Sequence, residues 1–350
     1  MVTLTTAPVP TTVSIADAPA EWNAYVDAHP HATGYHAWAW RDVFEQAFGH
    51  EAAYLVARRE RRPVGVLPVI LFRSALFGRF AVSLPFVNYG GVLADDEDAA
   101  DALVAHAGAI LARRGARHLE LRHRLRRFPA LPAKDHKVTL LLDLPATEEA
   151  CWQGLDRKVR NQVRKAEKSG LTASIGGRSL LPEFYAVFAR NMRDLGTPVY
   201  SPRFFDAIFA HIEPRVRVVV VRLGAEVIAA GITHTHRQVM EMPWASSLKE
   251  RRDLCPNNLL YWTVIREAIR TGHRVLDFGR STPDEGPYLF KLQWGARPEQ
   301  LWWEYCLNGT ATLPDQSTKN PRMQSAIALW KRLPLPVASF IGPHVVRSIP

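Results

Sequence analysis

Residues 274–295 read RVLDFGRSTPDEGPYLFKLQWG, and this stretch decides how the rest of the chain is interpreted. Its opening letters, VLDF, predict a short buried strand, and the Gly, Ser, Pro and Asp of residues 279–287 predict a tight surface loop. A second strand is predicted from Tyr288, and in a strand of period two Lys291 and Phe290 lie on opposite faces. The Lys291 ammonium is then displayed at the mouth of the loop, where it could meet an oxyanion or a phosphate. The alternative is a lysine whose stem lies along apolar surface.

The composition is that of a globular protein. A length of 350 residues favours two domains, and 47% hydrophobic with 22% charged residues excludes a chain that is disordered throughout. No apolar run is long enough to span a membrane, and the first residues, MVTLTTAPVPTTVSI, lack the pattern of a signal peptide, so a cytoplasmic protein is predicted. The three cysteines, Cys151, Cys255 and Cys306, lie far apart, so we expect no disulfide framework, no metal site and no bound cofactor.

The basic residues are concentrated in one predicted helix. Lys and Arg number 44 against 34 Asp and Glu, a net charge of +10, which favours an anionic partner. Residues 148–170 predict an amphipathic helix whose apolar side is Leu155, Val159, Val163 and Ala166 and whose opposite side carries Arg157, Arg160, Arg164 and Lys168, with Lys158, Asn161 and Lys165 nearby. Because Glu167 is the only acidic residue placed to compensate these cations, a phosphate-bearing ligand is one interpretation, and a solvated helix face is the other.

The same order of elements occurs twice. PVGVLPV aligns with EVIAAGI at an offset of 163 residues, from Pro63 to Glu226, and RRGARHLELR aligns with RTGHRVLDFG at 157, from Arg113 to Arg270. Two similar offsets indicate a duplication, with coincidence among similar segments as the alternative. Strands alternate with helices in each copy, so we expect an α/β (α+β) fold of two domains that share a cleft. The predicted boundaries are a disordered tail at 1–15, domains at 16–145 and 146–306, and a C-terminal helix and tail at 307–350.

The C-terminal region has a different character from the two copies. It contains an amphipathic helix at residues 321–332 and then an apolar tail interrupted by Pro334, Pro336 and Pro343. The prolines favour packing onto the body of the protein, and peripheral contact with a membrane surface is the alternative.

Three motifs together resemble the FemAB (FemXAB) family, which consists of tandem domains of the GNAT acyltransferase superfamily. They are DRKVRNQVRKAEKSGL, PNNLLYWTVIREAIRTG and DFGRSTPDEGPYLFKLQWGA, and with the duplicated unit they give a likeness from about Trp22 onward. The chain is most similar to the FemAB-like proteins found with PEP-CTERM/exosortase exopolysaccharide systems. The resemblance implies two GNAT-like domains, each with a mixed, mostly antiparallel sheet. It also implies transfer of an aminoacyl group from aminoacyl-tRNA to an amine of a phosphate-bearing cell-wall precursor, without a covalent enzyme intermediate.

The resemblance also implies which residues form the site. Phe290 and Lys291 match the family's Phe-Lys pair, at the acceptor end of the tRNA and the reacting carbonyl. The other residues are expected to bind substrate: Arg157, Lys158, Arg160, Asn161 and Arg164 of the basic helix, Asn88 and Tyr89 of VNYGG, Tyr200, Trp244, Asp277 and Arg280. Asn88, Tyr89, Tyr200 and Trp244 have core packing as their alternative role. No general base is assigned among Asp277, Asp284 and Glu285, because each could equally be a structural residue.

Two further functions stay open at this stage. One is an N-acyltransferase that takes its acyl group from acyl-CoA or an acyl carrier protein and acts in exopolysaccharide synthesis. The stretch SSLKERRDLCPNNLLYW, where GNAT enzymes seat the CoA pyrophosphate on a glycine-rich turn, contains no glycine, which disfavours CoA. The other is a basic module without enzymatic activity that binds a membrane or RNA.

Overall fold

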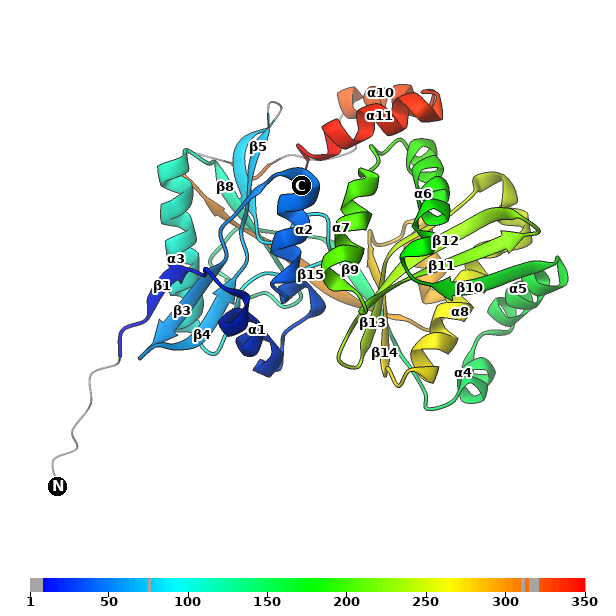
Figure 1. Ribbon diagram of the computed structural model, residues 1–350, viewed down its shortest axis with the longest axis horizontal. Coiled ribbons are helices and arrows are strands. Elements are labelled where there is room, and N and C mark those ends of the chain that lie inside the picture. Colours follow the sequence, from blue (N-terminus) through cyan, green and yellow to red (C-terminus); the bar gives the residue numbers. More distant parts are fainter. Residues whose placement is uncertain (1–8, 75–76, 310–311, 315–320, 350) are drawn as a thin grey trace. The chain divides into compact units, whose positions relative to one another are not determined.

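The computed structural model describes residues 9–74, 77–309, 312–314 and 321–349, and it has the expected mixed α/β fold (Figure 1). The chain divides into two compact units. Unit 1 comprises Met1–Glu45, Gly49–Ala133 and Trp303–Leu313, and unit 2 comprises Gln46–Phe48, Lys134–Trp302 and Pro314–Pro350. The division therefore falls at Ala133, and not at the predicted residue 145, because the strand that follows Ala133 pairs within unit 2.

Unit 1 contains two sheets. The first has the strand order β1-β3-β4-β7, and in the second β5 lies between β2 and β6, with β8 beyond β6 and the end of β15 next to β8. The elements that lie in this unit, wholly or in part, are β1 (Thr12–Ile15), α1 (Pro19–Ala28), η1 (Gly34–His36), α2 (Ala39–Phe48), β2 (Glu51–Ala52), β3 (Leu55–Arg59), β4 (Arg62–Leu67), β5 (Ile70–Ser74), β6 (Gly78–Val82), β7 (Leu93–Ala94), α3 (Glu97–Arg114), β8 (His118–His123) and β15 (Arg297–Leu307).

The prediction of a disordered tail at residues 1–15 is wrong for residues 12–15. Thr12 to Ile15 form β1, which pairs antiparallel with β3 so that Thr12 lies opposite Arg58. The alternating β-branched residues of TVSI are the signal for this strand. Residues 1–8 lie outside the described residues.

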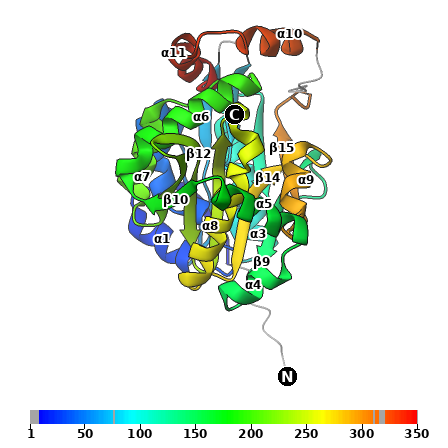
Figure 2. The same ribbon diagram turned by 90° about the vertical axis from the view of Figure 1, so that its right-hand side faces the viewer.

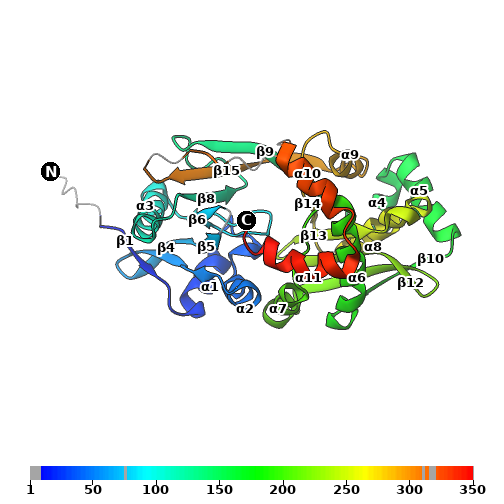
Figure 3. The same ribbon diagram turned by 90° about the horizontal axis from the view of Figure 1, so that it is seen from above.

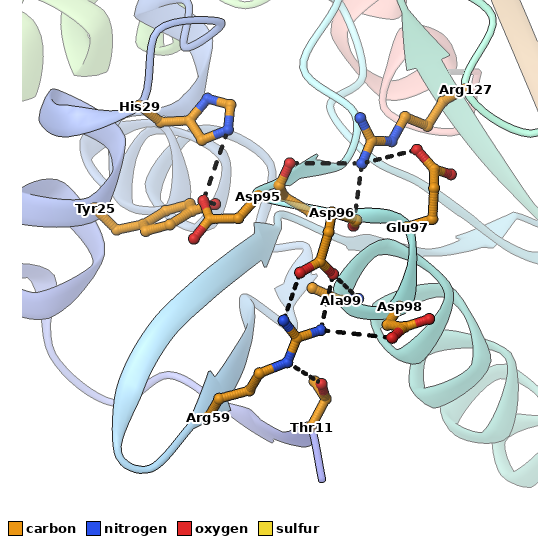
Figure 4. A network of polar contacts seen from close by, with 11 residues as sticks. Thr11, Tyr25, His29, Arg59, Asp95, Asp96, Glu97, Asp98, Ala99 and Arg127 are labelled. Atoms are coloured by element: carbon orange, nitrogen blue, oxygen red, sulfur yellow. Dashed lines mark hydrogen bonds and ion pairs between the residues drawn. The ribbon is translucent and has the colours of Figure 1, made fainter. Parts of the chain in front are cut away.

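A network of polar contacts fixes the start of α3 (Figure 4). Asp96 is the N-cap residue, and its Oδ1 accepts a hydrogen bond of 2.9 Å from the Ala99 amide. The same carboxylate receives two hydrogen bonds from Arg59 of β3. The Arg59 guanidinium and the Ala99 amide lower the pKa of Asp96 to about 2. The neighbouring Asp95 accepts a hydrogen bond from Tyr25 of α1, so α1, the β3–β4 hairpin and α3 meet here.

Unit 2 has one sheet in the order β10-β11-β12-β13-β14-β9. Helices α6, α7 and α8 pack against its strands, and α5 packs against α8 (Figures 1 and 2). The elements are β9 (Ala133–Asp143), α4 (Glu148–Gly154), α5 (Arg157–Lys168), β10 (Leu171–Gly176), η2 (Arg178–Leu180), α6 (Leu181–Leu195), α7 (Pro202–Ile212), β11 (Val216–Leu223), β12 (Glu226–His236), β13 (Val239–Ser247), η3 (Lys249–Leu254), α8 (Pro256–Arg270), β14 (Val275–Ser281), α9 (Gly286–Leu292), α10 (Pro321–Trp330) and α11 (Leu335–Val346).

Strands β13 and β14 run parallel and then part. They pair over three residues only, ending at Glu241 opposite Asp277. Beyond this point β13 stays on β12 as far as Ser247, while β14 pairs with β9 as far as Ser281. The facing edges of the two strands therefore have no strand between them in the described part of unit 2, so their backbone groups can bind a ligand.

Two predicted elements differ from the structure. The strand predicted from Tyr288 is a helix, α9, because Pro287 fixes the first-turn backbone and has no amide hydrogen for a ladder. The helix predicted at 148–170 is two helices, α4 and α5, since Leu155 has an extended backbone and Asp156 caps a new helix start.

Candidate active site

Lys291 lies on α9 and is buried, with 6% of its surface exposed. Its Nζ donates hydrogen bonds to two backbone carbonyls of β14, Gly279 O at 2.8 Å and Arg280 O at 3.2 Å. An ammonium has three N–H donors, so one is left for a ligand. The pKa of Lys291 is lowered to about 8, mainly by burial; the opposite charge of Asp277 limits the shift, and the like charge of Arg280 adds to it.

The carbonyls that hold Lys291 are turned out of the sheet by an irregularity of β14. The register between β14 and β9 shifts between Asp277 and Arg280, and Gly279 takes a left-handed backbone with φ +75. Asp277 is fully buried, and its Oδ1 accepts from the Thr139 hydroxyl at 2.5 Å and from the Gly279 amide at 2.7 Å. Asp277 thus fixes the bulge, and this geometry gives it a structural role in place of the predicted substrate contact.

Two further cations lie in the same part of unit 2. Burial is the main cause of a lowered pKa at Lys137 on β9, and Arg280 lowers that pKa further. Arg280 also lowers the pKa of Lys291. The Lys137 Nζ donates a hydrogen bond of 2.6 Å to Thr282 Oγ1, at the loop after β14. A guanidinium that lowers the pKa values of two lysines indicates a positive potential, which favours an oxyanion or a phosphate. Sequence reasoning missed Lys137, because it lies 154 residues before Lys291.

Phe290 forms part of an aromatic cluster beside Lys291. Its ring centroid is 5.3 Å from that of Tyr261 on α8 and 6.3 Å from that of Trp294. The Trp294 indole nitrogen and the Ser281 hydroxyl are buried and have no hydrogen-bond partner within the described residues. The region around Lys291 thus offers further unused polar groups beside an apolar wall.

The basic side of α5 carries cations without acidic partners. Its apolar residues Val159, Val163 and Ala166 are buried as predicted, while Arg157, Lys158, Asn161 and Arg164 are exposed and Arg160 is partly buried. None of the six Lys and Arg side chains of α5 forms an ion pair with a residue that the structure describes; Arg164 instead lies over the Trp152 ring, 5.4 Å from its centroid.

Some arginines elsewhere in unit 2 have acidic partners. Arg222 pairs with Glu183, and Arg251 pairs with Glu226 at 2.8 Å. A pocket of about 500 Å³ lies along α5, lined by Asp156, Arg157, Lys158, Asn161, Gln162 and Lys165. Cations that face a pocket and lack internal partners are the residues expected to bind an anionic ligand.

The remaining predicted residues are mostly packing residues. Trp244 is buried and makes edge contacts with Phe204 and Phe205 at 5.7 and 5.5 Å, and Tyr200 packs on the same two rings. The core alternative therefore describes Tyr200 and Trp244 better than the predicted role as walls of a site.

Asn88 and Tyr89 lie in unit 1, in the loop between β6 and β7. Both are buried, and the Asn88 Nδ2 has no hydrogen-bond partner within the described residues. Phe86 in the same loop has a positive φ of 67, a strained backbone for an aromatic residue. Strain and an unsatisfied amide are typical of functional loops, so a role for Asn88 in binding stays a prediction.

The connection from β13 to α8 has no phosphate cradle of the usual GNAT kind. It is the 3-10 helix η3, followed by Cys255 with φ 58. Arg251 in this connection is paired with Glu226, and the Asn258 amide of α8 donates to Gln162 of α5 at 3.2 Å. Because α8 begins with Pro256, its first position has no amide hydrogen for an anion.

Comparison with known proteins identifies the kind of domain that carries Lys291. Residues 154–291 match the family model of the acetyltransferase (GNAT) domain, a segment that ends at Lys291. No curated protein matches the chain. The solved structure of FemX is similar to the chain, with a TM-score of 0.64 and 14% identity over 84% of this chain and 96% of that one. A tandem GNAT protein from the clavulanic acid biosynthesis pathway is similar with a TM-score of 0.53 and 13% identity, over 87% of this chain and 100% of that one.

Residues 154–291 therefore form an acetyltransferase (GNAT) domain. The fold of the chain is similar to those of FemX and of a tandem GNAT protein, as the sequence motifs predicted. The acetyltransferase domain favours an acyltransferase over the alternative of a module without enzymatic activity. Among the described residues, no helix is both long and apolar enough to cross a membrane.

Proposed function

We propose that the protein transfers an aminoacyl group from aminoacyl-tRNA to an amine of a phosphate-bearing acceptor such as a cell-wall precursor. The buried Lys291 carries this proposal, because it lies at the end of the GNAT domain and keeps one N–H donor free. The likeness to FemX supports the same class of donor and acceptor.

The chemistry needs a fixed positive charge. The acceptor nitrogen attacks the carbonyl carbon of the aminoacyl ester, a C–N bond forms, the bond to the ribose oxygen breaks, and the proton lost by the amine ends on the ribose hydroxyl. Negative charge develops on the carbonyl oxygen before that bond breaks. In the proposal the third N–H of Lys291 donates to this oxygen, and Lys137 and Arg280 add to the positive potential.

The positive side of α5 favours a polyanionic donor. Six cations lie along 12 residues, a length of about 18 Å at 1.5 Å per residue, which matches several consecutive phosphates better than one pyrophosphate. The glycine-free connection before α8 and its paired Arg251 argue against CoA in the usual GNAT position.

Donor binding tests the proposal. A fluorescent charged tRNA and acyl-CoA are titrated against the protein at several salt concentrations, with wild type, the double variant Arg157→Glu/Lys158→Glu and the control Lys249→Glu, whose lysine is exposed on η3. We expect tRNA binding that weakens steeply with salt, and a salt slope reduced by about 2 in the double variant alone. Tight acyl-CoA binding without tRNA binding would favour the acyl-CoA-dependent alternative instead.

A further inference from the structure

Helix α11 has an apolar stripe that the described residues leave exposed. Val337, Phe340 and Ile341 are spaced i, i+3 and i+4, so they share one face of the helix. They are 40%, 75% and 38% exposed, and Leu329 of the preceding helix α10 is 66% exposed. Exposed large apolar residues gathered on one short helical pair indicate an interaction surface.

The exposed stripe is held in place by the opposite side of α11. Ala338, Gly342 and Val346 are buried, and α11 packs against α6 (Figures 2 and 3). The contact is close: a Cβ at Gly342 would lie 2.8 Å from the Val199 amide nitrogen. The orientation of Phe340 is therefore a property of the packed unit.

The acidic and basic side chains of the C-terminal segment itself are of one sign. From residue 316 to residue 350 the sequence contains no Asp or Glu and five Lys or Arg, half of the net charge of +10. Three of these cations, Lys331, Arg332 and Arg347, are in the described region and are exposed. They lie at the end of α10 and at the end of α11, so they flank the stripe.

We propose that the α10–α11 surface, defined by Leu329, Val337, Phe340 and Ile341 with Lys331, Arg332 and Arg347, binds the surface of a bilayer rich in anionic phospholipid. Apolar side chains enter the interface while neighbouring cations meet the headgroups, and the helices lie flat, since neither is long enough to span. A second copy of the chain fits less well, because a two-fold contact through this face would oppose the same cations against each other.

Vesicle binding tests the inference without any acyl donor, so its outcome does not depend on the proposed function. Vesicles of phosphatidylcholine alone and vesicles containing about one-third phosphatidylglycerol are sedimented with the full chain. We expect binding to the anionic vesicles that weakens with salt, at least a tenfold loss in Phe340→Ser/Ile341→Ser, and a loss of roughly fivefold per charge in Lys331→Gln/Arg332→Gln. Leu125→Ser, which changes a 70% exposed leucine of unit 1, is the matched control and should bind as wild type.

Three results would overturn the inference. They are equal binding to both kinds of vesicle, wild-type binding by Phe340→Ser/Ile341→Ser, and a dimer in sedimentation equilibrium that this variant dissociates. Circular dichroism melts establish that each variant is folded, so a loss of binding reports on the surface.

Discussion

Replacing Lys291 by methionine should abolish most of the turnover while leaving the fold intact. Methionine has a similar length but no charge and no N–H, so the variant loses the donor that we assign to the developing oxyanion. Removing one preorganised donor of this kind costs about 10² to 10³ in kcat, or roughly 3–4 kcal/mol. The KM for the donor should change little, because the proposal assigns donor affinity to α5.

The effect on stability should be small at neutral pH, for a reason that the structure supplies. Burial lowers the pKa of Lys291 from 10.5 to about 8. Between pH 8 and pH 10.5 Lys291 binds more protons in the unfolded chain than in the folded one, so its titration makes the free energy of unfolding rise with pH. Below pH 8 the buried charge of Lys291 lowers the free energy of unfolding by about 3 kcal/mol. Methionine removes that cost but leaves the carbonyls of Gly279 and Arg280 without their donor, at about 1–3 kcal/mol each. The two effects largely offset each other.

The assay is therefore a pair of measurements on the same preparation. Transfer rates are measured under single-turnover conditions, and thermal unfolding is followed at pH 7 and at pH 10, with Lys249→Met as a control for loss of an exposed lysine. The wild type should gain stability relative to Lys291→Met between pH 8 and pH 10.5. A variant that is folded and retains transfer within threefold of wild type would refute the role given to Lys291.

Other predictions concern the packing and capping of unit 1. Gly91→Ala should destabilise the protein by about 2–4 kcal/mol, because its Cβ would lie 2.2 Å from the His123 ring. Gly108→Ala on α3 should stabilise the protein by about 0.5–1 kcal/mol, because its Cβ would meet no atom within 4 Å. Chemical denaturation measures the free energy of unfolding of both variants. Asp96→Ala should cost about 1–2 kcal/mol through the lost cap of α3. Since the pKa of Asp96 is lowered to about 2, its charge should contribute to the free energy of unfolding above pH 4, and this contribution should be lost as the pH falls toward 2. If the free energy of unfolding of Asp96→Ala depends on pH between 4 and 2 as strongly as that of wild type, this prediction is contradicted.

The fold was predictable where local signals mark the ends of elements. In helices α3, α6 and α7 such residues stand at the observed ends: Asp96 caps α3 and Gly115 ends it, Gly196 ends α6, and Pro202 begins α7. The prediction was wrong at α9, where aromatic residues favour a strand and a single proline at the first turn decides for a helix.

The site was predictable only where a motif lies within one segment. Lys291 and the α5 cations stand out in the sequence because each belongs to a recognisable motif. The pairing of β9 with β14 places Lys137 near Arg280 and Thr282, a contact between distant segments that no local pattern encodes. Tyr200 and Trp244 show the reverse case, since aromatic residues that suggest the wall of a site pack on Phe204 and Phe205.

The identity of the donor tests the central claim most directly. The purified protein is incubated with an amine acceptor and either tRNA charged with a labelled amino acid or labelled acetyl-CoA, and the labelled product is counted. The account predicts product from the charged tRNA, none after ribonuclease treatment, and almost none with Lys291→Met. Product formed from acetyl-CoA and not from charged tRNA would contradict it.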